Sequence, residues 1–399
     1  MSRILVTGGF GLLGRHLANH LAEKIHHVTV VDDLSNSWLG GVRYTEFIQL
    51  DVTKTSAQNT IAKCRPDVVF HLACHPYESL SQFTPADVST SIVTGTINTL
   101  VGAINSGTCK RFVNLSSLAR YGSGTALIWN KMASRDIVQH GRAVKAESGY
   151  LSYKSGAMPP FVDSSEDFWH IPAPEDIYGI SKVHAERSVE VLCDLHGIEW
   201  CHAVPWNVYG PSNLRSLADP YRNVVSLWIN ALLRDKPIVI FGDGQQRRAP
   251  SYVGDVVPAI AKMGFLPEAA GQVINVGAER HMTIKEMAQA TVAAWSEVAG
   301  ARSTIWSGDS MAGAPDGIWD AVAEKLIRYE SERPCEVKHA YCSVEKAKRL
   351  LGYEDKTPLR EGIKKTIEWA LELAPNGVEP RYLDHYEIEK KMPRVWQCS

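Results

Sequence analysis

Long apolar runs and blocks of like charge are both missing from this chain of 399 residues. No segment approaches the apolar length needed to cross a bilayer, and no charged leader precedes the first apolar stretch. The 42 basic and 44 acidic residues are interspersed and give a formal net charge of -2, so nothing draws the chain to nucleic acid or to an anionic membrane. We therefore expect a cytoplasmic protein that acts on a small molecule.

Cysteine pairs at metal-binding or redox spacing are missing as well. The 8 cysteines are scattered without a C-x-x-C pair, which indicates neither a zinc ribbon nor a disulfide framework. His16 and His20 share a helix face, but no acidic or cysteine partner joins them, so we expect no metal site. What the chain does have is 45% hydrophobic residues, enough to bury a large core.

Short apolar, β-branched runs alternate with helical patterns in the first half of the chain. The runs cover residues 3–6, 27–31, 47–50, 67–72, 111–116 and 199–204. Alternation of this kind is typical of βαβ units, so we predict an α/β fold with a doubly wound parallel sheet and helices on both faces.

The pattern becomes irregular after Asn207, with frequent Pro and Gly. We predict a dinucleotide-binding domain over residues 1–206 and a smaller C-terminal α/β lobe over residues 207–399 that binds the substrate. A strand near residues 272–276 is a candidate to return to the first sheet. Residues 123–160 form an insertion of weak periodicity between two parts of the site, and they are interpreted either as a lid over the substrate or as a solvated or dimer-contacting excursion.

A glycine-rich turn follows the first predicted strand. Gly8, Gly11 and Gly14 open a helix, a context that permits a tight turn and close approach of a pyrophosphate, as in Rossmann-type domains. Asp32 ends the second strand where a carboxylate binds the adenosine ribose and repels a 2′-phosphate, so NAD is favoured over NADP. Asp33 is the alternative ribose ligand. Asp51 and Val52 are interpreted either as bordering the adenine or as a surface turn.

A tyrosine and a lysine lie four residues apart further along the chain. Tyr178 and Lys182 share one face of a helix, where an ammonium group can hold a phenol near ionisation. The tyrosine is then usable as a base at neutral pH. Together with the upstream Ser116-Ser117 pair and the glycine turn, these residues predict a redox site.

The motifs at these positions resemble the extended short-chain dehydrogenase/reductase family, and within it the NAD-dependent nucleotide-sugar epimerase/dehydratase branch (UDP-glucose 4-epimerase-like). The resemblance runs over nearly the whole chain. Its marks include T-G-G-F-G-L-L-G at 7–14, H-L-A-C at 71–74, S-S-L-A-R-Y-G at 116–122, Y-G-I-S-K at 178–182, W-N-V-Y-G-P at 206–211 and F-G-D-G-Q-Q-R-R at 241–248.

The resemblance implies roles for individual residues. The catalytic residues would be Ser117, which hydrogen-bonds the reacting sugar oxygen, the base Tyr178, and Lys182, which binds the nicotinamide ribose. The cofactor-binding residues would be Gly8, Phe10, Gly11, Leu12, Gly14, Asp32, Asp51, Val52, Leu72, Ala73, Tyr178 and Lys182. The substrate-binding residues would be Ser117, Asn207, Asn223, Arg248, Arg333 and Glu336. Arg247 stays an alternative to Arg248, and an ordinary turn stays an alternative role for Asn207.

The branch members differ in the residues that follow the catalytic hydroxyl. Where dehydratases of this family carry an Asp-Glu pair, this chain has Leu118 and Ala119, and Ala119 also lacks the acid of the decarboxylases. The resemblance therefore implies a 4-epimerase that oxidises C4 transiently with bound NAD. An NAD(P)H-dependent reductase of a 4-keto sugar and a non-catalytic dinucleotide-binding regulator are the alternatives. Relatives pair two helices across a two-fold axis, so a homodimer is expected.

Overall fold

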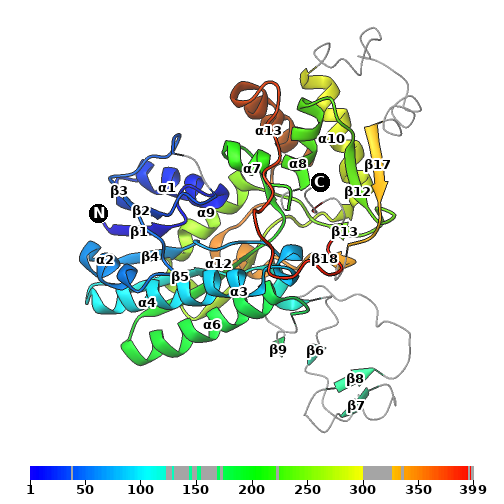
Figure 1. Cartoon of the computed structure of the whole chain (residues 1–399). Coiled ribbons are helices and arrows are strands. Elements are labelled where there is room, and N and C mark those ends of the chain that lie inside the picture. Colours follow the sequence, from blue (N-terminus) through cyan, green and yellow to red (C-terminus); the bar gives the residue numbers. More distant parts are fainter. Residues whose placement is uncertain are drawn as a thin grey trace.

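A seven-stranded parallel sheet forms the centre of the N-terminal part of the protein, as shown by a computed structural model (Figure 1). The model describes residues 1–36, 39–122, 174–221, 224–299, 326–333, 337–393 and 396, together with the backbone of the short strands at 128–129, 143–145, 151–153 and 169–170. The strands of the seven-stranded sheet lie in the order β15-β10-β5-β4-β1-β2-β3. The sheet strands are β1 (Arg3–Thr7), β2 (His27–Asp32), β3 (Glu46–Gln49), β4 (Val68–His71), β5 (Arg111–Leu115), β10 (Glu199–Pro205) and β15 (Gln272–Val276).

This order is the doubly wound arrangement that the strand pattern predicted, so the fold class is confirmed. The chain runs outward from β1 to β3, returns to β4 beside β1, and continues outward through β5 and β10. Such a reversal places a ligand-binding crevice at the carboxyl ends of the strands. The strand expected near residues 272–276 is β15, which pairs in parallel with β10 at the edge of the same sheet.

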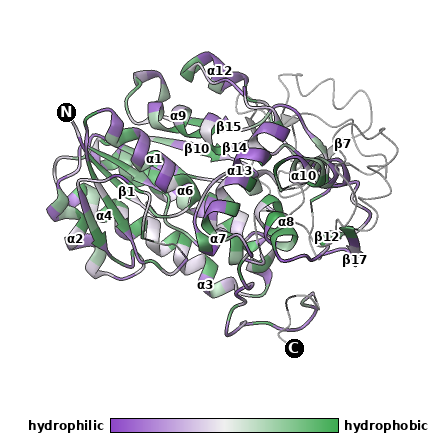
Figure 2. Ribbon diagram, turned by 90° about the horizontal axis from the view of Figure 1, so that it is seen from above, coloured by the Kyte–Doolittle hydropathy of each residue, from purple (hydrophilic) through white to green (hydrophobic). Residues whose placement is uncertain are grey.

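Helices cover both faces of the sheet (Figure 1). One face carries α1 (Leu12–Glu23), α9 (Val253–Met263) and α12 (Glu345–Leu351), and the other carries α2 (Ser56–Cys64), α4 (Gly95–Asn105) and α6 (Ile177–His196). The inner strands are largely apolar, because both of their faces are buried, whereas the edge strand β3 is partly exposed (Figure 2). Val6, Val30, Phe70 and Val113 belong to the core shared with α1 and α9.

The C-terminal lobe has its own core. Helices α8 (Val224–Leu233), α10 (Ile284–Ala299) and α13 (Leu359–Leu373) pack against β12 (Ile238–Phe241), which pairs in parallel with β17 (Ile327–Glu330). A second small sheet joins β16 (Met282–Thr283), β13 (Arg247–Arg248) and β18 (His339–Ala340). A short helix, α7 (Leu214–Ala218), precedes α8.

Beyond α13 the chain has a long irregular tail that returns to the first domain. It passes the η1 (Ser79–Gln82) and α3 (Pro85–Ser89) segments, which follow β4. In Figure 1 it is the red trace that leaves α13. Most of the predicted 123–160 insertion lies outside the described residues; within it the model gives only β6 (Ile128–Trp129), β7 (Ala143–Lys145) and β8 (Leu151–Tyr153). In the part of the chain that the model describes, no helix is long and apolar enough to cross a membrane.

Candidate active site

A cavity of about 960 Å³ opens at the carboxyl ends of the sheet strands and continues into the C-terminal lobe. From the sheet side it is lined by residues that directly follow β1, β2, β4, β5 and β10, among them Gly8, Asp33, Cys74, Ser117 and Trp206. Several strands therefore deliver side chains to one place although they are far apart in sequence, as expected for an α/β sheet.

The glycine turn is tight enough to exclude larger residues. Gly8 has φ +67, which a residue with a side chain rarely adopts, and a Cβ added at Gly14 would come within 2.0 Å of the Gly8 carbonyl oxygen. Gly11 caps the N-terminus of α1, whose first amides point at the cavity end. This cradle fits the pyrophosphate of a dinucleotide, because a helix N-terminus and close backbone approach both favour an anion.

Asp32 holds the turn and the next loop together. Its carboxylate accepts hydrogen bonds from the Phe10 amide at 3.0 Å and from the Leu34 amide at 2.9 Å, and its side chain is buried. Asp33 instead accepts from the amide and the hydroxyl of Ser35. Both carboxylates line the cavity. Asp51 and Val52 line it as well, together with Leu72 and Ala73.

His71 is a structural residue at the end of β4. Its Nδ1 lies 2.8 Å from the Thr7 hydroxyl and its Nε2 lies 3.0 Å from the Thr96 hydroxyl. Burial, followed by the positive charge of Lys182, lowers the pKa of His71 to about 3. The ring is therefore neutral and ties the glycine turn to the strand that supplies Cys74.

Ser117, Tyr178 and Lys182 meet in the cavity as the motifs predicted. Ser117 caps the short η3 helix (Leu118–Tyr121) by accepting from the Ala119 amide at 3.3 Å, and its hydroxyl lies near enough to Tyr178 to lower the pKa of the phenol. Asp176 caps α6 by accepting from the Gly179 amide at 2.7 Å, which fixes the turn that carries Tyr178. The Lys182 ammonium donates to the Leu115 carbonyl at 2.8 Å and lies 3.4 Å from the Cys74 sulfur.

The electrostatics of this site differ from the sequence prediction. Lys182 was expected to hold the phenol near ionisation, but its nitrogen lies 5.7 Å from the centroid of the Tyr178 ring and bonds other groups. Burial raises the pKa of Tyr178 well above its ordinary value, Cys74 raises it further, and the Ser117 hydrogen bond only partly opposes them. The protein alone therefore keeps the phenol protonated.

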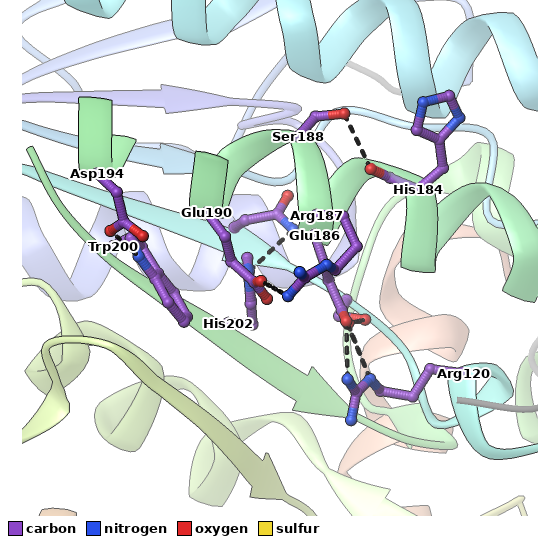
Figure 3. Close-up of polar contacts among 11 residues, drawn as sticks. Arg120, His184, Glu186, Arg187, Ser188, Glu190, Asp194, Trp200 and His202 are labelled. Carbon is purple, nitrogen blue, oxygen red and sulfur yellow. Dashed lines mark hydrogen bonds and ion pairs between the residues drawn. The ribbon is translucent and has the colours of Figure 1, made fainter. Parts of the chain in front are cut away.

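A buried ion pair supports the strand end that carries Ser117 (Figure 3). Glu186, on the inner face of α6, accepts hydrogen bonds from the Nε and Nη2 groups of Arg120 and from the Ser116 hydroxyl. Both charged side chains are buried, with exposed fractions of 10% for Arg120 and 1% for Glu186. One turn further along α6, Glu190 contacts His202 of β10. These contacts fix α6 against β5 and β10.

The C-terminal lobe supplies the other half of the cavity. Asn207 lines it in a left-handed backbone conformation, with φ +43, and its carbonyl accepts from the Ser251 amide. Arg248 also lines it, whereas the Arg247 guanidinium approaches His281 at 3.3 Å. Arg333 lies over the Phe241 ring, 4.9 Å from its centroid. The predicted ligands Asn223 and Glu336 lie outside the described residues.

The motifs missed two groups of cavity residues. One is the loop after β4, which contributes Glu78 and Ser79. The other is the tail beyond α13, which contributes Pro380, Tyr382 and Trp396. The loop directly follows the predicted strand at 67–72, so its place at the carboxyl end of the sheet could have been predicted from the sequence. The tail gives no local signal, because its place depends on contacts with distant residues.

Comparison with known proteins identifies the family. Residues 4–277 match the model of the NAD dependent epimerase/dehydratase family. The chain is 27% identical over 375 residues to UDP-glucose 4-epimerase of Mycolicibacterium smegmatis, covering 92% of this chain and 98% of that protein. It is 26% identical over 388 residues to UDP-N-acetyl-alpha-D-glucosaminuronate decarboxylase of Bacillus cytotoxicus, covering 93% and 98%.

Solved structures agree with this comparison. An epimerase of Methanothermobacter thermautotrophicus superposes with a TM-score of 0.69 at 26% identity, covering 93% of this chain and 92% of that one. UDP-glucose 4-epimerase of Thermotoga maritima, solved with UDP-glucose, gives 0.67 at 26% identity and covers 92% and 98%. The glycine cradle and the cavity fit the dinucleotide that this family requires. The chain belongs to the NAD-dependent epimerase/dehydratase family, and its cofactor is NAD.

Proposed function

We propose that this enzyme is a nucleotide-sugar 4-epimerase of the UDP-hexose type. The observation that carries the proposal is the meeting of Ser117, Tyr178 and Lys182 in one cavity beside the apolar Leu118 and Ala119. A hydroxyl, a phenol and a lysine suffice for reversible oxidation of a sugar hydroxyl. Elimination of water needs a further acid and base, and neither Leu118 nor Ala119 can supply them.

The chain's own residues would act on the C4 hydroxyl of the sugar. NAD, when bound, accepts a hydride from C4 and returns it to the other face of the 4-keto sugar. Tyr178 would take the C4 hydroxyl proton as a phenolate and give it back after the sugar has turned. Ser117, whose hydroxyl faces the same cavity as the phenol, would hold the reacting oxygen in line with it. Lys182 would bind the nicotinamide ribose and keep its positive charge near the phenol.

The C-terminal lobe would hold the nucleotide while the sugar turns. Arg248 and Arg333 line the cavity, and a guanidinium offers a planar set of donors that suits diphosphate oxygens. Asn207 would contact the diphosphate, and Asn223 and Glu336 remain further predicted contacts to the substrate. Binding energy would thus be used at a distance from the reacting carbon.

Acidic residues near Tyr178 favour a neutral sugar over a uronate at that end of the cavity. Glu78 lines it, and its charge is close enough to raise the pKa of Tyr178. Asp87 lines it too, hydrogen-bonded to His75 at 2.7 Å. A sugar carboxylate at this end would face both acids. This arrangement argues against the decarboxylase reaction named for the Bacillus cytotoxicus relative.

The direct test is an NMR assay of the sugar protons. Purified enzyme, supplied with NAD, is incubated separately with UDP-glucose, UDP-galactose, their N-acetyl forms and UDP-glucuronate. We expect the C4 epimer of at least one neutral sugar to appear with no net consumption of NAD. Stoichiometric use of added NADH or NADPH with a 4-keto sugar, and no epimer, would replace the proposal with the reductase.

We also propose that the enzyme is a homodimer that pairs through the outer face of α6. Ile180, Val191 and Leu195 lie along one stripe of that helix and are 50%, 61% and 73% exposed. Apolar side chains in a line on a helix are typical of a helix–helix contact. The cytoplasmic location stays a prediction.

A further inference from the structure

The tail beyond α13 bridges the two halves of the molecule across the cavity. We name the described tail residues, 378–393 and 396, the C-terminal strap. At its start, Val378 exchanges two hydrogen bonds with the side chain of Asn230 on α8, at 2.7 and 2.8 Å. The Arg381 amide then donates to the Ala218 carbonyl at the end of α7. The strap is thus fixed first to the C-terminal lobe.

The far end of the strap is fixed to the sheet domain. The amides of Glu387 and Ile388 donate to the Phe83 carbonyl at 3.0 and 3.1 Å. The Glu387 carboxylate accepts from the amides of Ala86 and Asp87, both at 2.8 Å. These contacts hold the strap against the segment that follows β4, the same segment that lines the cavity with His75 and Glu78.

A chain of hydroxyl groups fixes the middle of the strap. The Leu383 amide donates to the Tyr221 hydroxyl at 2.8 Å, which lies 2.6 Å from the Tyr386 hydroxyl. Tyr386 donates to the Trp396 carbonyl at 2.9 Å, so the proton between the two tyrosines must come from Tyr221. Each donor in this buried series has one acceptor, which defines a single docked arrangement.

Two aromatic side chains of the strap line the cavity. Tyr382 and Trp396 both pack edge-on against Tyr221, with ring centroids 6.2 and 5.6 Å away. Tyr221 in turn packs edge-on against Tyr77 of the loop after β4. All four rings belong to the apolar cluster that contains Tyr178. The strap therefore adds its rings at the Tyr178 end of the cavity.

We propose that the C-terminal strap is part of the sugar-binding site, with Tyr382 as a specificity-determining residue that packs against the sugar ring and the buried Trp396 as part of the aromatic cluster that holds it. An aromatic face offers an apolar surface to the C–H groups of a pyranose, and rigid rings bind at low cost in conformational entropy. The inference rests on the proposed function, because it takes a nucleotide-linked sugar as the ligand. The strap supplies a wall that the family motifs do not encode.

The contact role is tested with Tyr382→Ala, a partly buried position whose truncation spares the core. Its matched control is Ile388→Ala, at a strap position that is 45% exposed. Calorimetry on the NAD-loaded enzyme measures the Kd of UDP-glucose and of UDP. We expect Tyr382→Ala to weaken UDP-glucose binding about tenfold while the Kd of UDP stays within about twofold, and the control to change neither.

The docking role is tested with Glu387→Ala, which removes the acceptor for the two α3 amides. Its matched control is Glu389→Ala, at an exposed strap position. We expect Glu387→Ala to weaken UDP-glucose binding in the same direction and to make the tail more sensitive to limited proteolysis, with UDP binding preserved.

The outcomes separate the inference from the proposed function. If the wild type binds UDP-glucose and forms its epimer but Tyr382→Ala leaves its Kd unchanged, or weakens UDP equally, the strap proposal is overturned and the function stands. If the wild type binds neither UDP nor any UDP-sugar of the NMR panel, both are overturned. If the wild type binds without turnover, the ratio of the two Kd values still decides the role of the strap.

Discussion

The Tyr178 hydroxyl is the group whose removal should separate catalysis from binding. Tyr178→Phe keeps the ring in its buried place and removes only the proton-transfer group, so we expect turnover to fall by at least about 100-fold. Binding of NAD and of UDP should stay within about twofold of the wild type, because the glycine cradle and the arginines are unchanged. Stopped-time NMR and calorimetry give the two quantities. Retained turnover would rule out Tyr178 as the base.

The charge of Glu78 should set the preference between neutral and anionic sugars. Glu78→Gln removes a negative charge from the cavity while keeping the size of the side chain. We expect the affinity for UDP-glucuronate to rise several-fold relative to that for UDP-glucose, since a Coulomb repulsion on the order of 1 kcal/mol is lost. Glu372→Gln, on α13, is the control. An unchanged ratio of the two Kd values would show that the sugar does not lie near this carboxylate.

At the scale of the helix, protonation of Asp176 at the start of α6 makes the stability of the protein depend on pH. Burial, followed by the negative charge of Glu78, raises the pKa of Asp176 to about 7, well above the ordinary value of about 4 for an aspartate. Between these values the folded protein keeps a proton that the unfolded chain has lost, so stability from this group falls as pH rises from about 4 to 7. We expect Asp176→Asn, which can still cap the helix, to remove this part of the pH dependence.

Thermal unfolding at several pH values tests this prediction. The difference in Tm between pH 5 and pH 8 should shrink by on the order of 2 °C in Asp176→Asn. The exposed Asp384→Asn should leave that difference unchanged. A variant as pH-sensitive as the wild type would show that the carboxyl titrates at its ordinary pKa.

The Arg120–Glu186 pair is expected to be the most sensitive contact between α6 and the sheet. Glu186→Gln leaves the Arg120 guanidinium buried without its counter-charge, so we expect a loss of about 3–5 kcal/mol in the free energy of unfolding. Glu361→Gln, which breaks an exposed pair with Lys364, should cost less than about 1 kcal/mol. Urea unfolding measures both. If both variants lose equally little in the free energy of unfolding, another group must compensate the Arg120 charge.

At the scale of the whole molecule, local pattern predicted the sheet and the cofactor end but not the tail. Apolar runs predicted the sheet strands, because most of them are buried on both faces, and Gly8 and Gly14 marked a turn that only glycine fits. The strap rests on Asn230, Phe83 and Tyr221, whose contacts to it span long stretches of sequence. The hydrophobic periodicity of a sequence reflects only local structure, so it does not predict such contacts. The raised pKa of Tyr178 could not be predicted from the spacing of Tyr178 and Lys182, because it arises mainly from burial of the phenol.

The outer stripe of α6 should control assembly. A charge placed at Leu195, which is 73% exposed, would have to be desolvated if two copies of α6 packed together. We therefore expect Leu195→Glu to halve the mass measured by light scattering, from dimer to monomer. Leu373→Glu, at a 42% exposed position on α13, is the matched control and should leave the mass unchanged. Since Tyr178 and Lys182 lie on the opposite, buried face of α6, the Leu195→Glu monomer should still bind NAD. A wild type that is already monomeric would overturn the homodimer. A dimer that persists in Leu195→Glu would show that the two copies do not pair through α6.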